Sequence, residues 1–506
     1  MTAAATGAAR TGTLERDALA VLQPGFAGTD VPDWVLRRLD EGLASVALFG
    51  RNVESAEQLT RLTGRLRADH PGLLVAVDEE GGDVTRIEVG RGSSVPGNYA
   101  LGTVDDTDLT RAVAAGLGRA LAACGIDLDW APSVDVNANP DNPVIGVRSF
   151  GTDPALVARH AAAYVEGLQS AGVAASAKHF PGHGDTAVDS HHSLPRIDVG
   201  RDVLDARDLV PFRAAVAAGA KAVMSAHIIS PALDPDRPAT LSGRVLTGLL
   251  RDELGFQGLI ITDGMDMQAI AATYGTEHGT ALAIAAGADA ICVGGGPFDE
   301  GTVLRLRDAL VAAVRGGELP EERLAEAAAR VRALGEWTLR ARGAAGPGAA
   351  AQEGTAPGDP VGLVAARRAV RVTGTAKPLS TPAYVAVLTA APNIAVGSQT
   401  PWGVGPELAK LLPATATGTY TEDSYGTAEV LAAAGERPLV VAVRDVHRHP
   451  WTARALDELV AARPGTVVVE MGLDVAPARG ALHIATHGAA RVCARAAAEV
   501  IAGRVA

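Results

Sequence analysis

The feature that most constrains the fold is a repeated alternation of short apolar runs with helical patterns over roughly 300 residues, the span of a large barrel domain. Helical segments separate most of the apolar runs, among them Ala56–Ala68, Leu109–Cys124, Pro154–Ala171 and Thr276–Ala286. The apolar runs predict eight strands: Val21–Phe26, Leu43–Phe49, Leu73–Val77, Ile126–Ala131, Val173–Ala177, Ala222–Ala226, Leu259–Thr262 and Asp289–Val293. Continuous apolar strands in this alternation predict a parallel sheet buried on both faces. Eight units favour a closed (β/α)₈ barrel over an open doubly wound sheet.

A second, smaller α/β domain follows. A helix over Pro320–Arg342 runs into a segment rich in Gly, Ala and Pro, which predicts a linker. Beyond it the predicted strands are Tyr384–Leu388, Leu439–Val443, Thr466–Glu470 and Leu482–Ala485, and the predicted helices are Thr427–Ala434, Thr452–Ala462 and Arg491–Ala502. We therefore expect a disordered tail at residues 1–13, a barrel at 14–342, a linker at 343–360 and an α/β sandwich at 361–506. The second domain carries no comparable chemical motif, which favours a supporting or interaction role.

Charge and cysteine content exclude several classes of protein. The formal net charge of −13 gives no electrostatic footprint for nucleic acid or an anionic membrane. The three cysteines, Cys124, Cys292 and Cys493, are far apart in the sequence, which predicts buried, reduced thiols in place of a disulfide framework. The N-terminal residues contain no apolar signal region, and no apolar run reaches the ~20 residues of a membrane span. We expect a cytoplasmic protein.

Polar side chains follow the predicted strands at the end where a barrel places its functional groups. Strand three leads into Asp78-Glu79-Glu80 with Arg86 beyond, strand four leads through Asp135 to Arg148, and strand five opens a segment with Lys178, four histidines and two aspartates. Strand six ends at His227, and strand seven ends at Asp263. Polar clusters at successive strand ends converge on one mouth of the barrel, so we expect an active site there.

The mixture of donors and acceptors at this mouth fits sugar hydroxyls, because each hydroxyl both donates and accepts a hydrogen bond. The group consists of Asp78, Arg86, Arg148, Lys178 and His179. Asp263, directly after an apolar strand, is well placed as a nucleophile. Asp189 lies two residues from His191 and can hold that imidazole in one tautomer for proton transfer near neutral pH. A nucleophilic carboxylate with a proton donor is the equipment of retaining glycoside hydrolysis.

Each candidate also has a structural interpretation. Asp263 can be a helix N-cap, and Met265 and Met267 can be core or pocket wall. His183 and Asp185 fit loop bracing better than catalysis, and His192 fits a solvent-facing position. His227 can be a satisfied histidine at a strand end, and Glu79 and Glu80 can accept hydrogen bonds from backbone N–H groups beside Gly81-Gly82.

Several motifs together resemble glycoside hydrolase family 3, in particular its bacterial β-N-acetylglucosaminidase branch. The segments are A-L-F-G-R-N (47–52), V-D-E-E-G-G-D-V-T-R (77–86), D-V-N-A-N-P-D-N-P-V-I-G-V-R-S-F-G (135–151), K-H-F-P-G-H-G-D-T-A-V-D-S-H (178–191), V-M-S-A-H-I (223–228) and I-T-D-G-M-D-M (261–267). The resemblance implies a barrel followed by an α/β sandwich, and cleavage of terminal β-linked N-acetylglucosamine, often from cell-wall (muropeptide) fragments during recycling. It implies neither a metal nor an organic cofactor.

The resemblance also implies a role for each residue. Asp263 would be the nucleophile that forms a covalent glycosyl-enzyme, and His191 the general acid/base, oriented by Asp189. Asp78, Arg86, Arg148, Lys178 and His179 would grip the terminal sugar. The chain departs from the branch at Glu79, commonly Gln, at Asp83, commonly Arg, and at Gly264-Met265, commonly Asp-Leu. These departures lie beside the sugar-gripping residues, so the resemblance leaves the identity of the sugar open.

Alternative functions follow from the same residues. Some members with the histidine dyad resemble phosphorylases, in which phosphate resolves the intermediate in place of water; another family 3 β-glycosidase, such as a β-glucosidase, is a further alternative. The histidines and aspartates of the segment that begins at strand five suggest a metal-dependent hydrolase as another alternative. They lack, however, a His-x-x-x-His or His-x-His spacing. A non-catalytic sugar-binding protein would lack Asp263 or His191, and both are present. The sequence leaves the oligomeric state open.

Overall fold

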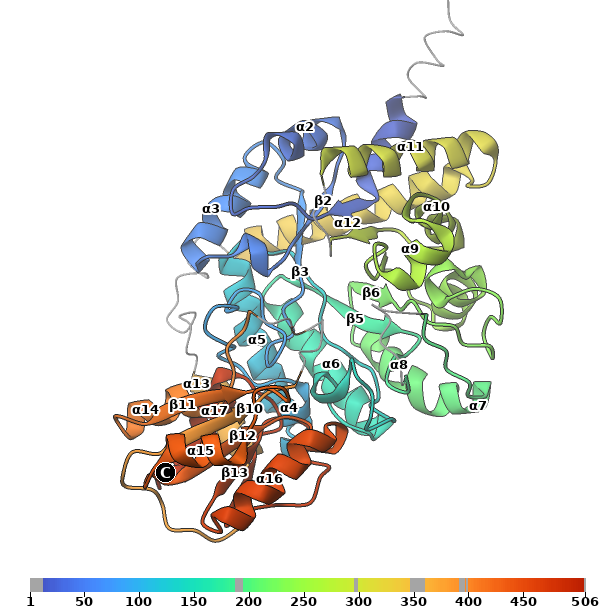
Figure 1. Cartoon of the computed structure of the whole chain (residues 1–506). Helices are drawn as coiled ribbons and strands as arrows, with labels where there is room; N and C mark the ends of the chain where they lie inside the picture. The colour runs from blue at the N-terminus through green and yellow to red at the C-terminus, as the bar shows by residue number, and fades with distance from the viewer. Residues whose placement is uncertain are drawn as a thin grey trace, which may run out of the picture.

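The computed structural model describes residues 12–186, 194–294, 299–345, 360–390, 396 and 399–504, which contain two parallel-sheet systems. Figure 1 shows the first system, in blue to yellow, surrounded by helices, and the second, in orange and red, against one side of it. The first system has the βα alternation that the sequence predicts. The described residues therefore form an α/β protein with a barrel-type sheet and a second α/β domain.

Eight strands form the barrel. They are β1 (Leu22–Pro24), β2 (Ser45–Leu48), β3 (Leu74–Val77), β4 (Leu128–Asp129), β5 (Ala174–Phe180), β6 (Ala222–Ser225), β7 (Leu259–Thr262) and β8 (Ile291–Val293). β2 to β7 form one curled parallel sheet in sequence order, and β1 and β8 form a parallel pair. The N–H of Thr262 donates to the carbonyl of Ala290 at 3.0 Å, which joins β7 to the β8 side. The hydroxyl of Ser45 in β2 donates to the carbonyl of Leu22 in β1 at 3.2 Å, so the eight strands follow one another around the barrel.

Helices cover the outside of this sheet. They are α2 (Asp33–Glu41), α3 (Ala56–Arg67), α4 (Asn98–Val104), α5 (Thr107–Ala123), α6 (Pro154–Ser170), α7 (Arg201–Val203), α8 (Leu209–Ala217), α9 (Gln268–Tyr274), α10 (Thr276–Ala286), α11 (Glu300–Gly316) and α12 (Glu321–Ala345). Local sequence sets their starts: Asp153 caps α6 by accepting from two backbone N–H groups, and Pro154 occupies the first helical position. The strands between them are buried throughout because Val, Leu, Ile and Ala face helices on one side and the barrel interior on the other.

The second domain is an open six-stranded sheet with the order β11-β10-β12-β13-β14-β9. Its strands are β9 (Arg371–Gly374), β10 (Tyr384–Leu388), β11 (Ala416–Tyr420), β12 (Leu439–Val443), β13 (Val467–Glu470) and β14 (Leu482–Ala485), and β9 alone among them pairs antiparallel. Its helices are α13 (Pro360–Ala369), α14 (Gly405–Leu411), α15 (Thr427–Ala434), α16 (Pro450–Ala462) and α17 (Arg491–Ile501). α13 packs against α17 and also against α4 and α5, which joins the two domains.

Several predicted boundaries need correction. β5 extends to Phe180, so Lys178 and His179 lie in a strand, whereas the sequence placed them after its end. Residues 12–20 are helical, so the last two residues of the predicted tail belong to a helix. α12 continues to Ala345, into the predicted linker, and residues 346–359 of that linker lie outside the described residues. β9 and β11 were not predicted. The domain boundaries themselves stay predictions.

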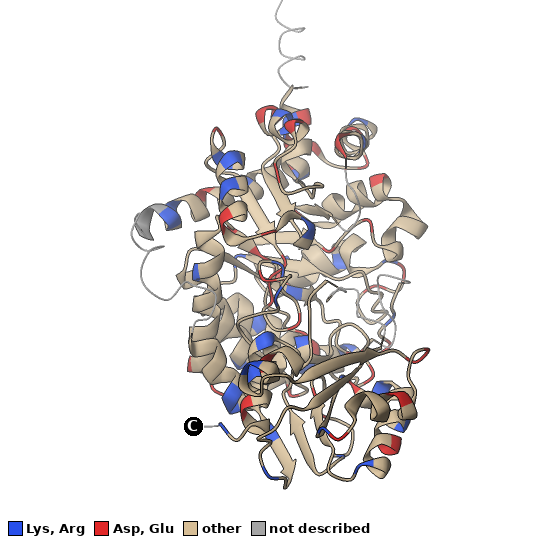
Figure 2. Ribbon diagram, turned by 60° about the vertical axis from the view of Figure 1, so that its left-hand side comes forward, with Lys and Arg blue, Asp and Glu red and all other residues tan. Residues whose placement is uncertain are grey.

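Surface and thiol chemistry follow the composition. Figure 2 shows basic and acidic residues interleaved over helices and loops, while the strands carry mostly uncharged residues. All three cysteines are buried and free, as predicted, and burial raises the pKa of each thiol. Within the described ranges, every helix is either too short or too polar to cross a bilayer.

Candidate active site

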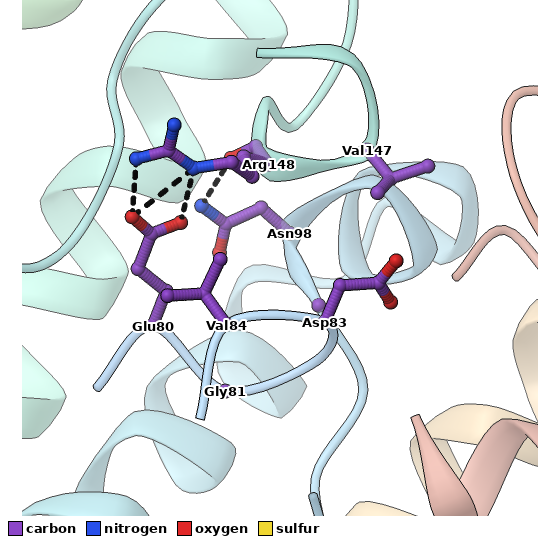
Figure 3. Close-up of a pocket in the computed structure, with 8 residues that line it drawn as sticks. Glu80, Gly81, Asp83, Val84, Asn98, Val147 and Arg148 are labelled. Atoms are coloured by element: carbon purple, nitrogen blue, oxygen red, sulfur yellow. Dashed lines mark hydrogen bonds and ion pairs between the residues drawn. The ribbon is translucent and has the colours of Figure 1, made fainter. Parts of the chain in front are cut away.

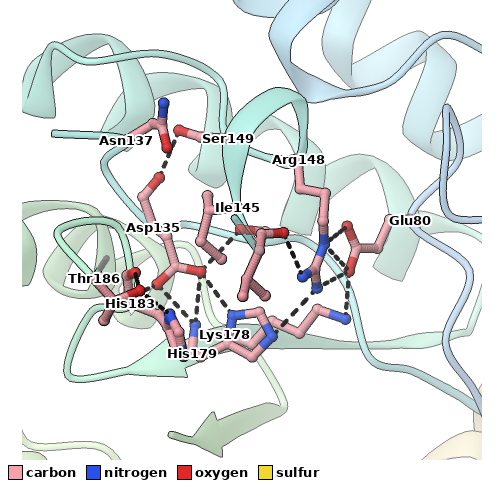
Figure 4. A network of polar contacts seen from close by, with 12 residues as sticks. Glu80, Asp135, Asn137, Ile145, Arg148, Ser149, Lys178, His179, His183 and Thr186 are labelled. Atoms are coloured by element: carbon pink, nitrogen blue, oxygen red, sulfur yellow. Dashed lines mark hydrogen bonds and ion pairs between the residues drawn. The ribbon is translucent and has the colours of Figure 1, made fainter. Parts of the chain in front are cut away.

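The predicted sugar-gripping residues meet at the C-terminal ends of β3 and β5. The ammonium of Lys178 lies 2.5 Å from Oδ1 of Asp78 and 2.6 Å from Oε1 of Glu80. Arg148 approaches the same Glu80 through two nitrogens, with Nη2 at 2.6 Å from Oε1 and Nε at 3.0 Å from Oε2. Figure 4 shows this arrangement, in which Glu80 lies between the guanidinium and the ammonium. Four charges from two strand ends and one loop therefore form a single network.

Burial and neighbouring charge together fix the ionisation of this network. Burial is the largest single influence and raises the pKa of Asp78, but Lys178, Arg86 and Arg148 together outweigh it and hold that pKa below its ordinary value. Burial opposes the ionised form of Glu80 in the same way, and Arg148 and Lys178 keep its pKa well below the ordinary value. Burial would lower the pKa of Lys178, whereas Asp78 and Glu80 raise it above the ordinary value. All members are charged at neutral pH.

Arg86 completes the group from the loop after β3. Its Nη2 lies 3.1 Å from Oδ2 of Asp78. Glu79 holds the backbone of this loop, because its Oε2 accepts from the N–H groups of Arg86 at 2.6 Å and Ile87 at 2.9 Å, and from the hydroxyl of Thr85 at 3.1 Å. Glu79 thus accepts from backbone N–H groups, as the structural interpretation expected. Glu80 does not share that role, since it pairs with Arg148 and Lys178.

Arg148 is positioned by asparagines. It ends a 3₁₀ turn over Gly146–Arg148, and Gly146 has φ of +46°, a conformation that favours glycine. Oδ1 of Asn142 accepts from the N–H groups of Val144 and Ile145, both at 2.9 Å, which shapes the approach to this turn. Nδ2 of Asn98 donates to the carbonyl of Arg148 at 2.7 Å. The backbone of Arg148 is therefore fixed independently of its ion pair.

His179 and His183 share one buried carboxylate, that of Asp135. Nδ1 of His179 lies 2.7 Å from Oδ2 of Asp135, and the backbone N–H of His183 donates to Oδ1 at 2.6 Å. Nε2 of His179 faces Arg148 at 3.4 Å. Burial lowers the pKa of His183 to about 4, so it is neutral near pH 7, and its Nδ1 lies 3.0 Å from the hydroxyl of Thr186. Asp135 thus anchors the beginning of the segment that follows β5 (Figure 4).

Asp263 lies at the end of β7 and is half-buried. Its backbone N–H donates to the carbonyl of Ser225 in β6 at 3.1 Å, and its Oδ1 accepts from the N–H of Gly264 at 2.7 Å. The N-cap interpretation is wrong, because α9 begins only at Gln268, after Met267. The charge of Asp263 partly opposes the lowering of the pKa of His183 by burial, and it adds to the rise that burial causes in the pKa of Cys292.

The remaining candidates have structural contacts. Both ring nitrogens of His227 are engaged, with Thr240 and with the carbonyl of Gly264, each at 2.9 Å. Asp185 pairs with Arg207 at 2.9 Å, which fits loop bracing. Met265 is fully buried, as expected of core or pocket wall.

Asp189, His191 and His192 fall within residues 187–193, outside the described residues, so their roles stay predictions. Among the residues that the structure does describe, no group of three or more His, Cys, Asp and Glu side chains is arranged to hold a metal ion.

A pocket adjoins the network. Its lining includes Glu80, Arg148, Asn98, Gly97 and Asp83. Figure 3 shows Asp83 pointing away from the Glu80–Arg148 pair.

The sequence did not single out Glu80 or Asp135 as site residues. Their signal was present, since each follows a strand end within a polar cluster, but the importance of each depends on partners tens of residues away.

The comparisons with known proteins agree with this architecture. Residues 30–334 match the profile described as the glycosyl hydrolase family 3 N terminal domain. This match identifies the protein as a glycoside hydrolase. The chain belongs to glycosyl hydrolase family 3.

Two curated relatives and one solved structure are informative. The chain is 40% identical over 277 residues to beta-hexosaminidase A of Pseudoalteromonas piscicida, across 50% of this chain and 46% of that protein, so the match spans less than half of the relative. It is 39% identical over 280 residues to a beta-hexosaminidase of Stenotrophomonas maltophilia (strain K279a), across 53% of this chain and 82% of the relative. A family 3 beta-N-acetylglucosaminidase from Paenibacillus sp. str. FPU-7 is similar in structure, with a TM-score of 0.85, 32% identity and 97% of each chain covered. This last likeness includes the second domain.

Proposed function

We propose that the protein is a retaining exo-β-N-acetylglucosaminidase that removes terminal β-linked N-acetylglucosamine. The observation that carries the proposal is the network of Asp78, Lys178, Glu80 and Arg148 at the same barrel mouth as Asp263. The names of the hexosaminidase relatives and of the Paenibacillus structure support the choice of sugar.

The network suits a terminal sugar ring. Asp78 is a permanent acceptor, and Lys178 and Arg86 are permanent donors on either side of it, so a hydroxyl at this point finds both partners it needs. The Asp78 side chain remains 17% exposed, while Lys178 and Glu80 are each 3% exposed. The partly exposed carboxylate is the one that would meet substrate, and its buried neighbours would fix its position.

The proposed chemistry has two steps. A carboxylate oxygen of Asp263 attacks the anomeric carbon as the glycosidic C–O bond breaks, and the leaving oxygen takes a proton from His191. Water then attacks the same carbon from the side of the departed group, gives its proton to His191, and releases Asp263, so that the product keeps the β configuration. Asp189 would orient His191 in both steps. The roles of His191 and Asp189 in this scheme rest on the sequence alone.

The direct test is hydrolysis of 4-nitrophenyl β-N-acetylglucosaminide. We expect Asp263→Ala to lose at least about a thousandfold in kcat, because the covalent route requires the nucleophile. Asp266→Asn, a half-buried carboxylate three residues further on, is the matched control and should stay within threefold of the parent. Undiminished turnover by Asp263→Ala would refute the assignment.

The proton donor is tested by varying the leaving group. His191→Ala should hardly slow the nitrophenyl substrate, whose leaving group needs little protonation, in its first step. It should slow a disaccharide of two β-linked N-acetylglucosamines much more, because a sugar alkoxide must be protonated as it leaves. Equal effects on the two substrates would remove His191 from this role.

Adding inorganic phosphate to the assay distinguishes hydrolysis from phosphorolysis. Product analysis by mass spectrometry with inorganic phosphate present should give free N-acetylglucosamine, and sugar 1-phosphate as the main product would identify a phosphorylase instead. Release of glucose from the corresponding glucoside at a higher kcat/KM would point to a β-glucosidase. Muropeptide fragments are the proposed natural substrates and enter the same assay.

A further inference from the structure

The turn between Glu80 and Arg86 extends from the barrel into the second domain. The N–H of Glu80 donates to the carbonyl of Val84 at 3.1 Å, and the N–H of Val84 donates to the carbonyl of Gly81 at 3.1 Å, so the turn is closed on itself. Gly81 and Gly82 have φ of +72° and +60°, and a Cβ at Gly82 would lie 2.4 Å from the backbone of Gly97. Asp83 stands at the tip of this tight turn, three residues after Glu80 and three residues before Arg86.

Asp83 is held by the second domain. Its Oδ2 forms an ion pair with Nη2 of Arg444, directly after β12, and its Oδ1 accepts from the backbone N–H of Ala489, beyond β14, at 2.6 Å. The Asp83 side chain is only 2% exposed. The guanidinium of Arg444 also lies over the ring of Trp402, 5.4 Å from its centroid. Both oxygens of one barrel carboxylate are therefore used by the C-terminal edge of the second sheet.

Other contacts converge on the same region. Nε2 of His447 lies 2.9 Å from the carbonyl of Pro140, in the segment that leads to Arg148. Arg491 donates to the carbonyl of Gly92 at 3.3 Å and lies 3.5 Å from Oε1 of Glu88. The second domain thus contacts the barrel on the loops that carry Arg86 and Arg148.

The turn and the second domain carry opposite charges where they meet. The residue of the turn is Asp83, and the facing group is Arg444. A buried carboxylate without a partner is costly, so the pair specifies one seating of the turn against the second domain.

We propose that Asp83 and Arg444 are positioning residues through which the second domain holds the sugar site in its binding geometry. Displacement of the tip would move Glu80 on one side and Arg86 on the other, and through them the two charged partners of the sugar, Arg148 and Asp78. The inference rests on the proposed function, because it assigns these residues to sugar binding. It gives the second domain a part in recognition.

The test is a double-mutant cycle on the nitrophenyl substrate with Asp83→Asn, Arg444→Gln and the double variant. We expect each single change to raise KM about tenfold with kcat within threefold, since small displacements of positioning groups cost up to about a hundredfold. The double variant should be no worse than either single variant, because the two residues act as one unit. Arg444→Lys keeps the charge and should restore KM to within threefold of the parent.

The matched control is Arg368→Gln. Arg368 also joins the two domains, through an ion pair with Asp106 at 2.7 Å, but that pair is at the start of α5, away from the turn. Its loss should leave KM unchanged. An equal rise of KM in this control would show that any loosened interface has the effect, and would overturn the specific role of Asp83.

Hydrogen exchange keeps the inference independent of catalysis. Arg444→Gln should speed exchange at the amides of Arg86 and Ile87, which Glu79 holds, whereas Arg368→Gln should not. An unchanged KM in the single variants, additive effects in the double variant, or unchanged exchange in this segment would each overturn the inference. A parent protein that leaves the nitrophenyl substrate intact would instead overturn the proposed function, and hydrogen exchange would still decide whether Asp83 and Arg444 hold the turn.

Discussion

The barrel carries buried carboxylates at both ends of its strands, and the two ends differ in what those carboxylates contact. At the C-terminal mouth, the oxygens of Asp78 meet the side chains of Lys178 and Arg86. At the N-terminal base, Asp127 precedes β4, where it accepts from the backbone N–H of Val75 in β3 at 2.9 Å and pairs with Arg67. The residue types are the same at both ends, but their partners are not.

A second base carboxylate repeats the pattern. Asp289, just before β8, accepts from the backbone N–H of Ile260 in β7 at 2.9 Å and pairs with Arg251 and Arg323. Both base carboxylates are fully buried, whereas Asp78 is partly exposed. A base carboxylate accepts from the backbone of the neighbouring strand and so holds two strands together. The carboxylate of Asp78 is held by side chains, which leaves it able to exchange one of these contacts for a contact with a ligand. The difference is that between stability and binding, as expected of the two faces of such a barrel.

The largest effect is expected at the base. Asp127→Asn should lower the free energy of unfolding by about 4 kcal/mol, because it leaves Arg67 and Arg342 facing each other without a counter-charge. Burial already lowers the pKa of each of these arginines to about 10. Urea unfolding measures the loss. The kcat/KM per folded molecule should remain within twofold, and a large fall in it would erase the distinction between the two ends.

The next prediction concerns an exception within the mouth. Burial raises the pKa of Glu79 to about 7, although three hydrogen bonds favour its ionised form. A carboxyl group whose pKa is raised on folding contributes stability that is complete below about pH 4.5 and is lost as pH rises through 7. Glu79→Gln, which supplies a neutral acceptor, should therefore gain stability over the parent as pH increases across this window, by at most about 3 kcal/mol.

Urea unfolding of the parent and Glu79→Gln from pH 4 to pH 8 checks this. The difference in unfolding free energy should grow between about pH 4.5 and 7 and then level off. A difference that does not vary with pH would mean that folding leaves the pKa of Glu79 unchanged. Since Glu79 holds the backbone of the Arg86 loop and faces no sugar in our proposal, kcat/KM at pH 7 should change less than threefold.

Asp78→Asn tests the binding end directly. We expect kcat/KM to fall about a hundredfold, equivalent to about 2.7 kcal/mol, because the side chain that accepts a hydrogen bond from the sugar hydroxyl loses its charge. Lys178 keeps its contact with Glu80 at 2.6 Å, and the amide oxygen of the variant can still accept from Arg86, so the free energy of unfolding should change by less than about 1 kcal/mol. Asp127→Asn is the matched variant with the reverse profile. If Asp78→Asn proved as destabilising as Asp127→Asn, the two ends would have one role.

Sequence patterns predicted the barrel well and the edges of the second sheet poorly. The eight barrel strands are buried on both sides, so their apolar runs are continuous and visible. β9 is exposed along its length, and β11 alternates between half-buried and exposed residues rich in Thr, so neither has such a run. Edge strands are specified by the partner they pair with, which periodicity along one segment does not reveal.

The same limit applies to the site. Lys178 and His179 read as loop residues because charged side chains interrupt an apolar run, yet pairing with β6 carries β5 through to Phe180. Asp78 and Arg86 were predicted as site residues because strand ends in barrels are functional. Glu80 was not, since its importance comes from Arg148, 68 residues further along. Residue type and strand position predict which groups are at the mouth, and only the folded chain shows which of them meet.

The smallest expected effect comes from a carboxylate that shares features of both ends. Asp135 is fully buried and accepts from backbone N–H groups, as the base carboxylates do, yet it also holds the ring of His179 at the proposed sugar site. Asp135→Asn keeps an acceptor but loses the charge, so it should loosen the ring without unfolding the segment. We expect kcat/KM to fall about tenfold, chiefly through KM, equivalent to about 1.4 kcal/mol. Calorimetric binding of N-acetylglucosamine should weaken in parallel, and a loss confined to unfolding free energy would place Asp135 with the base carboxylates instead.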